Sequence, residues 1–313
     1  LTKQPVLAKV VDSAKPAVTW NAKLWGLPMD FAGIGIIYNK DIFAKYGLQA
    51  PTTYREMEKV CRTLRTNGMT PFAGLLKENW SMGHFITLVH TNLLAAKKIV
   101  PAKFVADMNA GKASYGAVDT DQLFSVIDFY RANMDKNAEE WNWNEQQAAF
   151  AEGKAAMMVQ GLWSYGAAIG TNPKLNCGFV PFPVFNDAKM NKFYADVDSC
   201  FGVSAQSPAD KKAAALKFLE WLATPQAQKI WVEDYKLTLS FKGADVSKLG
   251  VPFVDLMANV GKNGAYPWAF ASYPTAVFED ACKNGAQQYV FNKKTAEAVI
   301  ADIDKQWAAN RKK

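Results

Sequence analysis

Leu24 to Asp41, Leu-Trp-Gly-Leu-Pro-Met-Asp-Phe-Ala-Gly-Ile-Gly-Ile-Ile-Tyr-Asn-Lys-Asp, is the stretch on which the fold prediction rests. Its first apolar piece should end as a strand at Pro28, because proline has no N–H to donate to a sheet ladder. Gly33 and Gly35 then permit a bend, and a buried strand resumes over residues 36–38. This pattern fits a chain that passes from one lobe to another. On these residues alone, two strands of one sheet joined by a loop is an equally good interpretation.

The composition fits a globular protein of ordinary domain size. The 313 residues are enough for two domains, and half of them are hydrophobic. There is no run of eighteen apolar residues, so the sequence predicts no membrane-spanning helix. Residues 1–10 lack the basic segment followed by an apolar segment that is typical of a signal peptide.

The net charge of +7 comes from Lys and Arg residues that are scattered along the chain. We favour a solvated basic surface over a binding site for anionic partners. No nucleic-acid-binding motif is present, so we expect no nucleic-acid partner.

The four cysteines are widely spaced and form no C-x-x-C pair, which argues against a zinc site. We expect buried free thiols rather than a disulfide framework at Cys61, Cys177, Cys200 and Cys282. His84 and His90 are six residues apart on a predicted helix with no ligand at metal-binding spacing. Packing or solvent exposure therefore explains them better than a metal does.

Strand patterns alternate with helix patterns along the chain, which predicts an α/β fold with largely parallel sheets. Three helix starts have clear signals. Thr53 and Glu56 form a capping box, and Ser207-Pro208 and Thr224-Pro225 each place a capping residue before a proline.

Three stretches, in order, resemble the carbohydrate-type extracellular solute-binding proteins of ABC importers, the group that includes maltose-binding protein. The first is Gly-Leu-Pro-Met-Asp followed by Ile-Ile-Tyr-Asn-Lys-Asp-Ile-Phe-Ala-Lys-Tyr-Gly-Leu, within residues 26–48. The second runs from Glu145 to Trp163, and the third from Gly202 to Gln228. Together they span most of the chain.

This resemblance implies a two-lobe periplasmic-binding-protein-like fold of the α/β class. Lobe 1 would comprise residues 1–31 and 198–240, and lobe 2 residues 32–197 and 241–313. Family members begin with a strand–helix–strand run that is not found before Leu24, so we expect the N-terminal part of lobe 1 to be missing. We then expect exposed apolar surface where the absent strands would pair.

The resemblance also implies a function. The protein would capture a carbohydrate, most plausibly an oligosaccharide, between its lobes and deliver it to membrane permease subunits of an ABC transporter. It would act as a monomer without a cofactor, outside the cytoplasm, either free in a periplasm or lipid-anchored. Closure of the lobes over the ligand would use the chain crossings as hinges.

A sugar site needs flat aromatic faces for the C–H faces of pyranose rings and polar groups for the hydroxyls. By resemblance, Trp163 matches the residue that stacks on the ligand. The other candidates lie on loops, crossings or an aromatic run, and each has a core or solvent-facing role as its alternative: Glu78, Trp80, Asp30, Phe31, Asp198 (preferred to Asp196), Trp268 and Tyr273. Trp141 and Trp143 are assigned to core or lid packing.

Two alternative functions are a glycan-degrading enzyme and a binder of an anionic saccharide. Asp196 and Asp198 are a carboxylate pair of the kind that glycoside hydrolysis requires, but their spacing does not place them on opposite sides of a sugar. No phosphate-binding loop, nucleophile elbow or zinc motif is present, so we predict that the protein is not an enzyme. An anionic saccharide would match the net charge of +7, and strong salt dependence of the affinity would indicate it.

Overall fold

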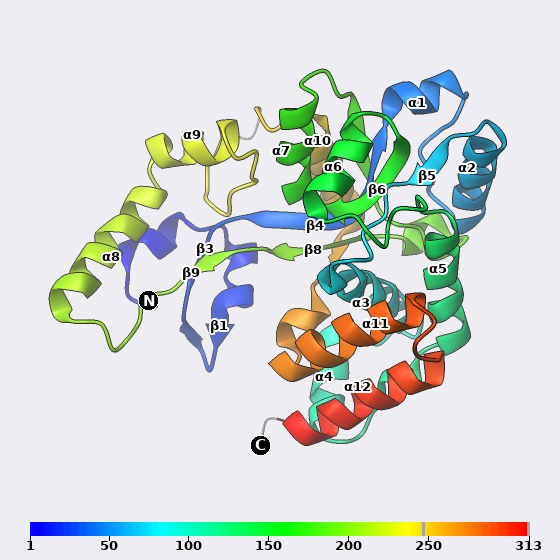
Figure 1. Cartoon of the computed structure of the whole chain (residues 1–313). Coiled ribbons are helices and arrows are strands. Elements are labelled where there is room, and N and C mark those ends of the chain that lie inside the picture. The colour runs from blue at the N-terminus through cyan, green and yellow to red at the C-terminus, as the bar shows by residue number, and fades with distance from the viewer. Residues whose placement is uncertain (246–247, 312–313) are drawn as a thin grey trace.

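The computed structural model describes residues 1–245 and 248–311. Two lobes of unequal size are joined by extended strands that run between them (Figure 1). The larger lobe is built on a six-stranded sheet covered by helices on both faces. The smaller lobe, on the left of Figure 1, contains α8, α9 and two small sheets. The predicted two-lobe α/β fold is therefore confirmed.

The central strand of the large sheet is β4 (Phe31–Asn39), which lies within the stretch Leu24–Asp41 on which the fold prediction rests. The strand order is β10-β8-β4-β6-β5, and β7 also pairs with β4. The other strands are β5 (Thr70–Phe72), β6 (Ala155–Gly161), β7 (Cys177–Val180), β8 (Phe193–Val197) and β10 (Ala265–Tyr266).

The large sheet is mixed, so the prediction of largely parallel sheets is wrong. β4 is antiparallel to β6, β7 and β8, whereas β5 pairs with β6 and β10 with β8 in parallel. The reason is the chain path: β4 carries the chain into the larger lobe, and β8 carries it back alongside. Two neighbouring strands that serve opposite crossings must run in opposite directions.

Gly33 and Gly35 lie inside β4 and do not interrupt it, contrary to the predicted bend. Their role is close packing. A Cβ on Gly33 would lie 2.7 Å from Leu256 Cδ1, and a Cβ on Gly35 would lie 2.5 Å from the Val180 carbonyl oxygen. The absence of a side chain lets helix α10 (Val251–Asn263) approach the sheet closely at Gly33.

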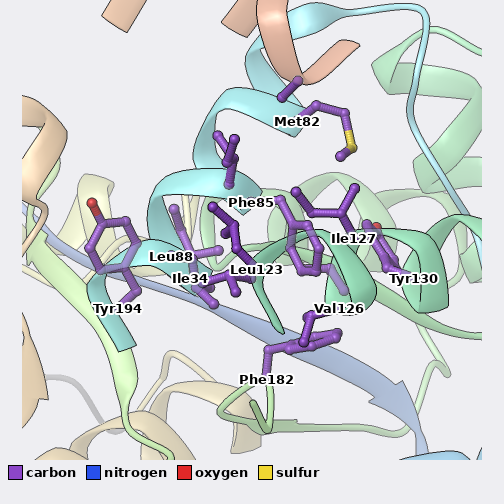
Figure 2. Close-up of a cluster of buried hydrophobic side chains, with 14 of the residues drawn as sticks. Ile34, Met82, Phe85, Leu88, Leu123, Val126, Ile127, Tyr130, Phe182 and Tyr194 are labelled. Carbon is purple, nitrogen blue, oxygen red and sulfur yellow. The ribbon is translucent and has the colours of Figure 1, made fainter. Parts of the chain in front are cut away.

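Alternate residues of β4 serve the two faces of the sheet, as period-2 geometry requires. Ile34 and Ile36 face one core, and Ile37 faces the other. The first core packs against α3, α5 and the C-terminal helices, and Figure 2 shows ten of its labelled residues, among them Phe85, Tyr130 and Phe182. The second core packs against α6 and α10 and continues into the smaller lobe.

The helices of the larger lobe are α1 (Lys40–Lys45), α2 (Tyr54–Thr66), α3 (Asn79–Ala96), α4 (Pro101–Asn109), α5 (Thr120–Ala132), α6 (Trp143–Ala151), α7 (Trp163–Thr171), α10, α11 (Asn284–Val290) and α12 (Ala296–Asn310). A π-helical segment, η7 (Val277–Lys283), leads into α11. Helix α3 is largely buried because η7, α11 and α5 pack around it. No described helix is both long and apolar enough to cross a membrane.

The smaller lobe is assembled from segments that are distant in sequence. Its elements are the 3-10 turns η1 (Pro5–Lys9), η2 (Asp12–Ala14) and η3 (Pro16–Val18), strands β1 (Thr19–Trp20), β2 (Lys23–Leu24), β3 (Leu27–Pro28) and β9 (Cys200–Phe201), and helices α8 (Ala209–Leu222) and α9 (Pro225–Glu233). Strand β3 ends at Pro28, as predicted, and Pro28 pairs with Cys200 of β9.

Large apolar side chains are exposed on the smaller lobe, while the expectation that absent strands would pair there stays a prediction. Phe218 on α8 is 47% exposed and Trp20 on β1 is 62% exposed. The ring of Phe218 stacks on Trp221 at 5.7 Å between centroids. These rings form part of a solvent-facing aromatic surface.

Three extended segments cross between the lobes and are hydrogen-bonded to one another. The Met29 N–H donates to the Ser199 carbonyl at 2.9 Å, and the Ser240 N–H donates to the Met29 carbonyl at 2.8 Å. The Phe31 N–H donates to the Thr238 carbonyl at 2.8 Å. The backbone of residues 29–31 therefore lies between the two other crossings.

The local predictions have mixed outcomes. The capping box at Thr53 and the cap at Thr224 are confirmed. Ser207 is not the cap of α8, because Pro208 itself occupies the N-cap position with extended dihedral angles. All four cysteines are free, and three are buried, but Cys200 is exposed at the edge of the smaller lobe, contrary to expectation.

Candidate functional site

Aromatic side chains from several elements gather where β6 ends and α7 begins. Trp163 opens α7, while Trp80 and His84 lie on the first turns of α3. The His84 ring centroid is 5.7 Å from that of Trp80 and 6.0 Å from that of Trp163. These three rings line a narrow cavity of about 10 Å³ together with Gln160, which is room for about one water molecule.

Gly161 places the Trp163 indole. A Cβ at position 161 would lie 2.1 Å from the Trp163 ring, so only glycine leaves room for the ring in this orientation. The indole is half-buried and lies edge-on to Trp268 at 6.1 Å between centroids. One part of the ring is thus held by neighbours while the remainder is accessible.

Glu78 holds Trp80 in place. One carboxylate oxygen of Glu78 accepts a hydrogen bond from Trp80 Nε1 at 2.6 Å, and the other accepts from the Trp143 backbone N–H at 2.7 Å. The carboxylate therefore ties the start of α3 to the start of α6. Trp143 is therefore more than a packing residue: its Nε1 also donates a hydrogen bond, to Ser164 Oγ at 3.4 Å.

The aromatic run of residues 266–273 divides between the site and the core. Trp268 is 6% exposed and is fixed by hydrogen bonds from its Nε1 to the Tyr194 carbonyl (2.9 Å) and from its N–H to Asp196 (3.3 Å). Tyr273 is 5% exposed and packs on Trp307 at 4.5 Å, away from Trp163. Phe270 is the member that reaches the site, with its ring 5.0 Å from His84.

Asp30 lies at the crossings. It is 3% exposed, and its carboxylate accepts hydrogen bonds from the Ser199 N–H at 2.9 Å and from the Ser199 hydroxyl. Burial raises the pKa of Asp30, and these hydrogen bonds oppose the rise. In this structure its partner is the return crossing. Phe31, next in sequence, is half-buried.

Asp196 and Asp198 differ in environment. Asp196 accepts the Trp268 N–H on one oxygen and its neighbour's N–H on the other, and burial raises its pKa. Asp198 is exposed. Its pKa is raised, first by desolvation and then by the nearby Asp30 carboxylate. Asp198 is the more accessible of the two for an incoming hydroxyl.

The two histidines are both neutral near pH 7. Burial, followed by the charge of Lys283, lowers the pKa of His84 to about 3. Burial lowers that of His90 to about 3, opposed by a hydrogen bond with the Tyr115 carbonyl. His90 stacks on Tyr115 at 3.7 Å in the core. Within the described chain, no three His, Cys, Asp or Glu side chains are grouped to hold a metal ion.

The structure brings together Trp163, Trp80 and Glu78, which the sequence offered as separate candidates, and their ligand-binding roles stay predictions. It adds His84 and Phe270, which were not among the candidates. A signal for His84 was present. Residues four apart share a helix face, so a helix that presents Trp80 also presents His84 beside it. Phe270 has no such local signal, because its position depends on how the 266–273 loop folds against α3.

The fold and site define a two-lobed solute-binding protein. Residues 1–229 match the family described as bacterial extracellular solute-binding proteins, and the chain belongs to this family.

Several curated relatives are named after the sugars they bind. The "Multiple sugar-binding protein" of Streptococcus mutans is 26% identical over 230 residues, covering 73% of this chain and 54% of that protein. The "Maltodextrin-binding protein MdxE" of Bacillus subtilis is 25% identical over 233 residues, covering 71% of this chain and 51% of that protein. The chain thus spans about half the length of the curated relatives it matches.

Solved structures confirm the fold. A "Chitin oligosaccharide binding protein" superposes with a TM-score of 0.84 at 22% identity, covering 98% of this chain and 77% of that one. The structure described as "SBP RafE in complex with raffinose" gives a TM-score of 0.81 at 19% identity, covering 100% and 80%. At these identities the likeness establishes the architecture alone.

Proposed function

We propose that the protein is the substrate-binding component of an ABC transporter, and that it captures a carbohydrate at the Trp80–Trp163 site and delivers it to the permease. The observation that carries the proposal is the aromatic cluster at the end of β6, beside the crossings that join the lobes. Indole faces pack well on the apolar faces of pyranose rings. The names of the curated relatives support a sugar as the ligand class.

The cavity among the Trp80, His84 and Trp163 rings is too small for a sugar, because about 10 Å³ holds a water molecule but not a pyranose. A pyranose that enters between these rings would require the lobes or the aromatic side chains to move apart first. The crossings provide hinges for this motion: residues 27–31, 197–200 and 238–241. We place lobe 1 at residues 1–31 and 198–240 and lobe 2 at 32–197 and 241–313.

Individual roles follow from the contacts. Trp163 and Trp80 would stack on sugar rings, with Trp268 beside Trp163. Phe31 packs against the core on the other face of β4 and is not part of this aromatic wall. Asp198 would accept a hydroxyl. The remaining candidates would act indirectly: Glu78 orients Trp80, Asp30 holds the hinge at Ser199, and Tyr273 supports the core beneath.

The proposed location, oligomeric state and partners follow from the family. We propose an extracytoplasmic monomer that needs no cofactor and contacts permease subunits when ligand-loaded. An anionic saccharide is less favoured, because Glu78, Asp196 and Asp198 bring negative charge to the region.

A thermal-shift screen with raffinose, stachyose, maltotriose and chitotriose tests the proposal. A binder gains RT ln(1 + [L]/Kd) of stability, about 2.7 kcal/mol when the ligand is at one hundred times Kd. A saturable rise in melting temperature without new reducing ends is expected. New reducing ends would instead indicate hydrolysis, and no shift with any neutral or anionic oligosaccharide would refute carbohydrate capture.

A further inference from the structure

His84 occupies the centre of the aromatic site. It follows Trp80 by four residues on α3, so both side chains project from one helix face. Its ring lies between those of Trp80 and Trp163 at 5.7 and 6.0 Å and lines the cavity that both of them line. A saccharide that stacks on either indole at this cavity would lie close to the imidazole.

The His84 imidazole packs against two phenylalanine rings, not against polar groups. Phe278 stacks on it at 5.7 Å with 18° between the planes, and Phe270 lies at 5.0 Å. Neither ring nitrogen of His84 forms a hydrogen bond with any residue in the described parts of the chain. Two other polar side chains of the cavity do have protein partners. Ser81 donates to backbone carbonyls and Gln160 donates to Gln146 at 2.8 Å.

The His84 nitrogens are not among the buried polar atoms of the described chain that lack a partner, so solvent reaches them in the free protein. A ligand that covers the ring and supplies no partner leaves a nitrogen unsatisfied, at a cost of about 1–3 kcal/mol, whereas a ligand of the same shape that supplies the partner avoids this cost. Unsatisfied polar groups in a site are therefore strong discriminators between ligands that differ by one hydroxyl.

The charges around His84 keep it neutral. Lys283 of η7 faces it and is paired with Glu279 at 2.6 Å while lying over the Phe278 ring. Glu78 is adjacent through Trp80, and the residues of β6 and α7 that line the cavity carry no charge. Burial and then Lys283 lower the pKa of His84 to about 3. A neutral imidazole has one donor and one acceptor nitrogen.

We propose that His84 hydrogen-bonds a hydroxyl of a neutral saccharide stacked on Trp80 or Trp163, and that this bond determines which saccharides the protein accepts. The inference rests on the proposed carbohydrate function and refines it. A hydroxyl both donates and accepts, so it matches either ring nitrogen. A carboxylate or sulfate can only accept, and it would meet a neutral ring rather than an imidazolium.

The test compares wild type with His84→Phe, His84→Asn and His84→Gln by titration calorimetry. The probe is whichever of raffinose, stachyose, maltotriose and chitotriose binds wild type most tightly. His84→Phe removes both nitrogens and keeps an aromatic ring on Phe278, although its six-membered ring is slightly larger than imidazole. We expect it to lose about 5- to 150-fold in affinity, the equivalent of about 1–3 kcal/mol, while its melting temperature stays within a few degrees of wild type.

Rescue and discrimination separate a ligand contact from a structural role. One of the two amide variants, whose nitrogen or oxygen replaces Nδ1 or Nε2, should recover affinity to within about fivefold of wild type. Wild type should also reject one monodeoxy derivative of the probe by a similar factor, and His84→Phe should bind that derivative and the parent sugar equally. The pH dependence of affinity from pH 5 to 8 should be the same in wild type and His84→Phe, because Asp198, whose pKa is raised to about 7 by burial and then by the nearby Asp30 carboxylate, titrates in both proteins.

The outcomes divide cleanly. If wild type binds the probe and His84→Phe binds it equally well, the role of His84 is refuted while carbohydrate capture stands. If affinity changes about tenfold around pH 6.5 in wild type but not in His84→Phe, the imidazole titrates in the site and its neutral role is overturned. If wild type binds no saccharide in the panel, the carbohydrate function itself fails, and this inference fails with it.

Discussion

Gly161 and Trp163 should be energetically coupled, and the structure allows the size of the coupling to be estimated. In Gly161→Ala the new methyl group would lie 2.1 Å from the Trp163 ring, far inside van der Waals contact. The indole must therefore leave its position between His84 and Trp268. Overpacking of this kind costs about 1–3 kcal/mol, and the displaced ring no longer presents its face to a ligand.

The assay is a double-mutant cycle of urea unfolding with wild type, Gly161→Ala, Trp163→Ala and the double variant. Once Trp163 is truncated the clash is gone, so Gly161→Ala should then cost little, and the two changes should be non-additive by about 1–3 kcal/mol. Additive effects within about 0.5 kcal/mol would show that the alanine methyl group does not meet the indole. The described geometry of the site would then be refuted.

Three further outcomes are expected. Trp163→Ala should weaken saccharide binding about 30- to 1,000-fold with only a small loss of melting temperature, because the ring is half-buried; a large stability loss with unchanged affinity in calorimetry would return it to the core. Gly33→Ala should lose about 1–3 kcal/mol in urea unfolding because the methyl would meet Leu256 at 2.7 Å, whereas the control Gly170→Ala, in a helix with open space around it, should gain about 0.5–1 kcal/mol; equal effects at the two glycines would contradict the tight packing of α10. Lowering the pH from 7.5 to 5 should remove up to about 2 kcal/mol of stability per buried histidine, since a pKa near 3 when folded and about 6.5 when unfolded means that stability is fully present above pH 6.5 and is lost as the pH falls toward 3.

Comparing wild type with His84→Phe isolates the contribution of His84 to that pH dependence. Buried carboxyls with raised pKa values change the stability in the opposite direction, but they do so equally in both proteins and cancel in the comparison. His84 keeps part of its ring exposed, so its share should be smaller than that of His90, which is fully buried. An unchanged slope of unfolding free energy between pH 6.5 and 5 in the variant would mean that His84 is protonated in the folded state.

Local signals in the sequence determined the features that depend on neighbouring residues. The capping box at Thr53 and the proline helix start at Thr224 are satisfied within one helical turn, so the sequence suffices to predict them. The ordered motifs also established the family and, through it, the two-lobe fold and the positions of Trp80 and Trp163. These positions follow strand ends, which can be recognised from an apolar run and the glycine after it.

Tertiary structure decided everything that depends on segments far apart in the chain. The glycines of β4 permit a bend as well as close packing, and only the approach of Leu256 shows which use applies. Asp30 is separated from Ser199 by 169 positions, so no local pattern reveals that this carboxylate holds the crossings together. The sheet is mixed because the same two lobes are joined by outgoing and returning strands, a constraint of chain path that residue propensities do not encode.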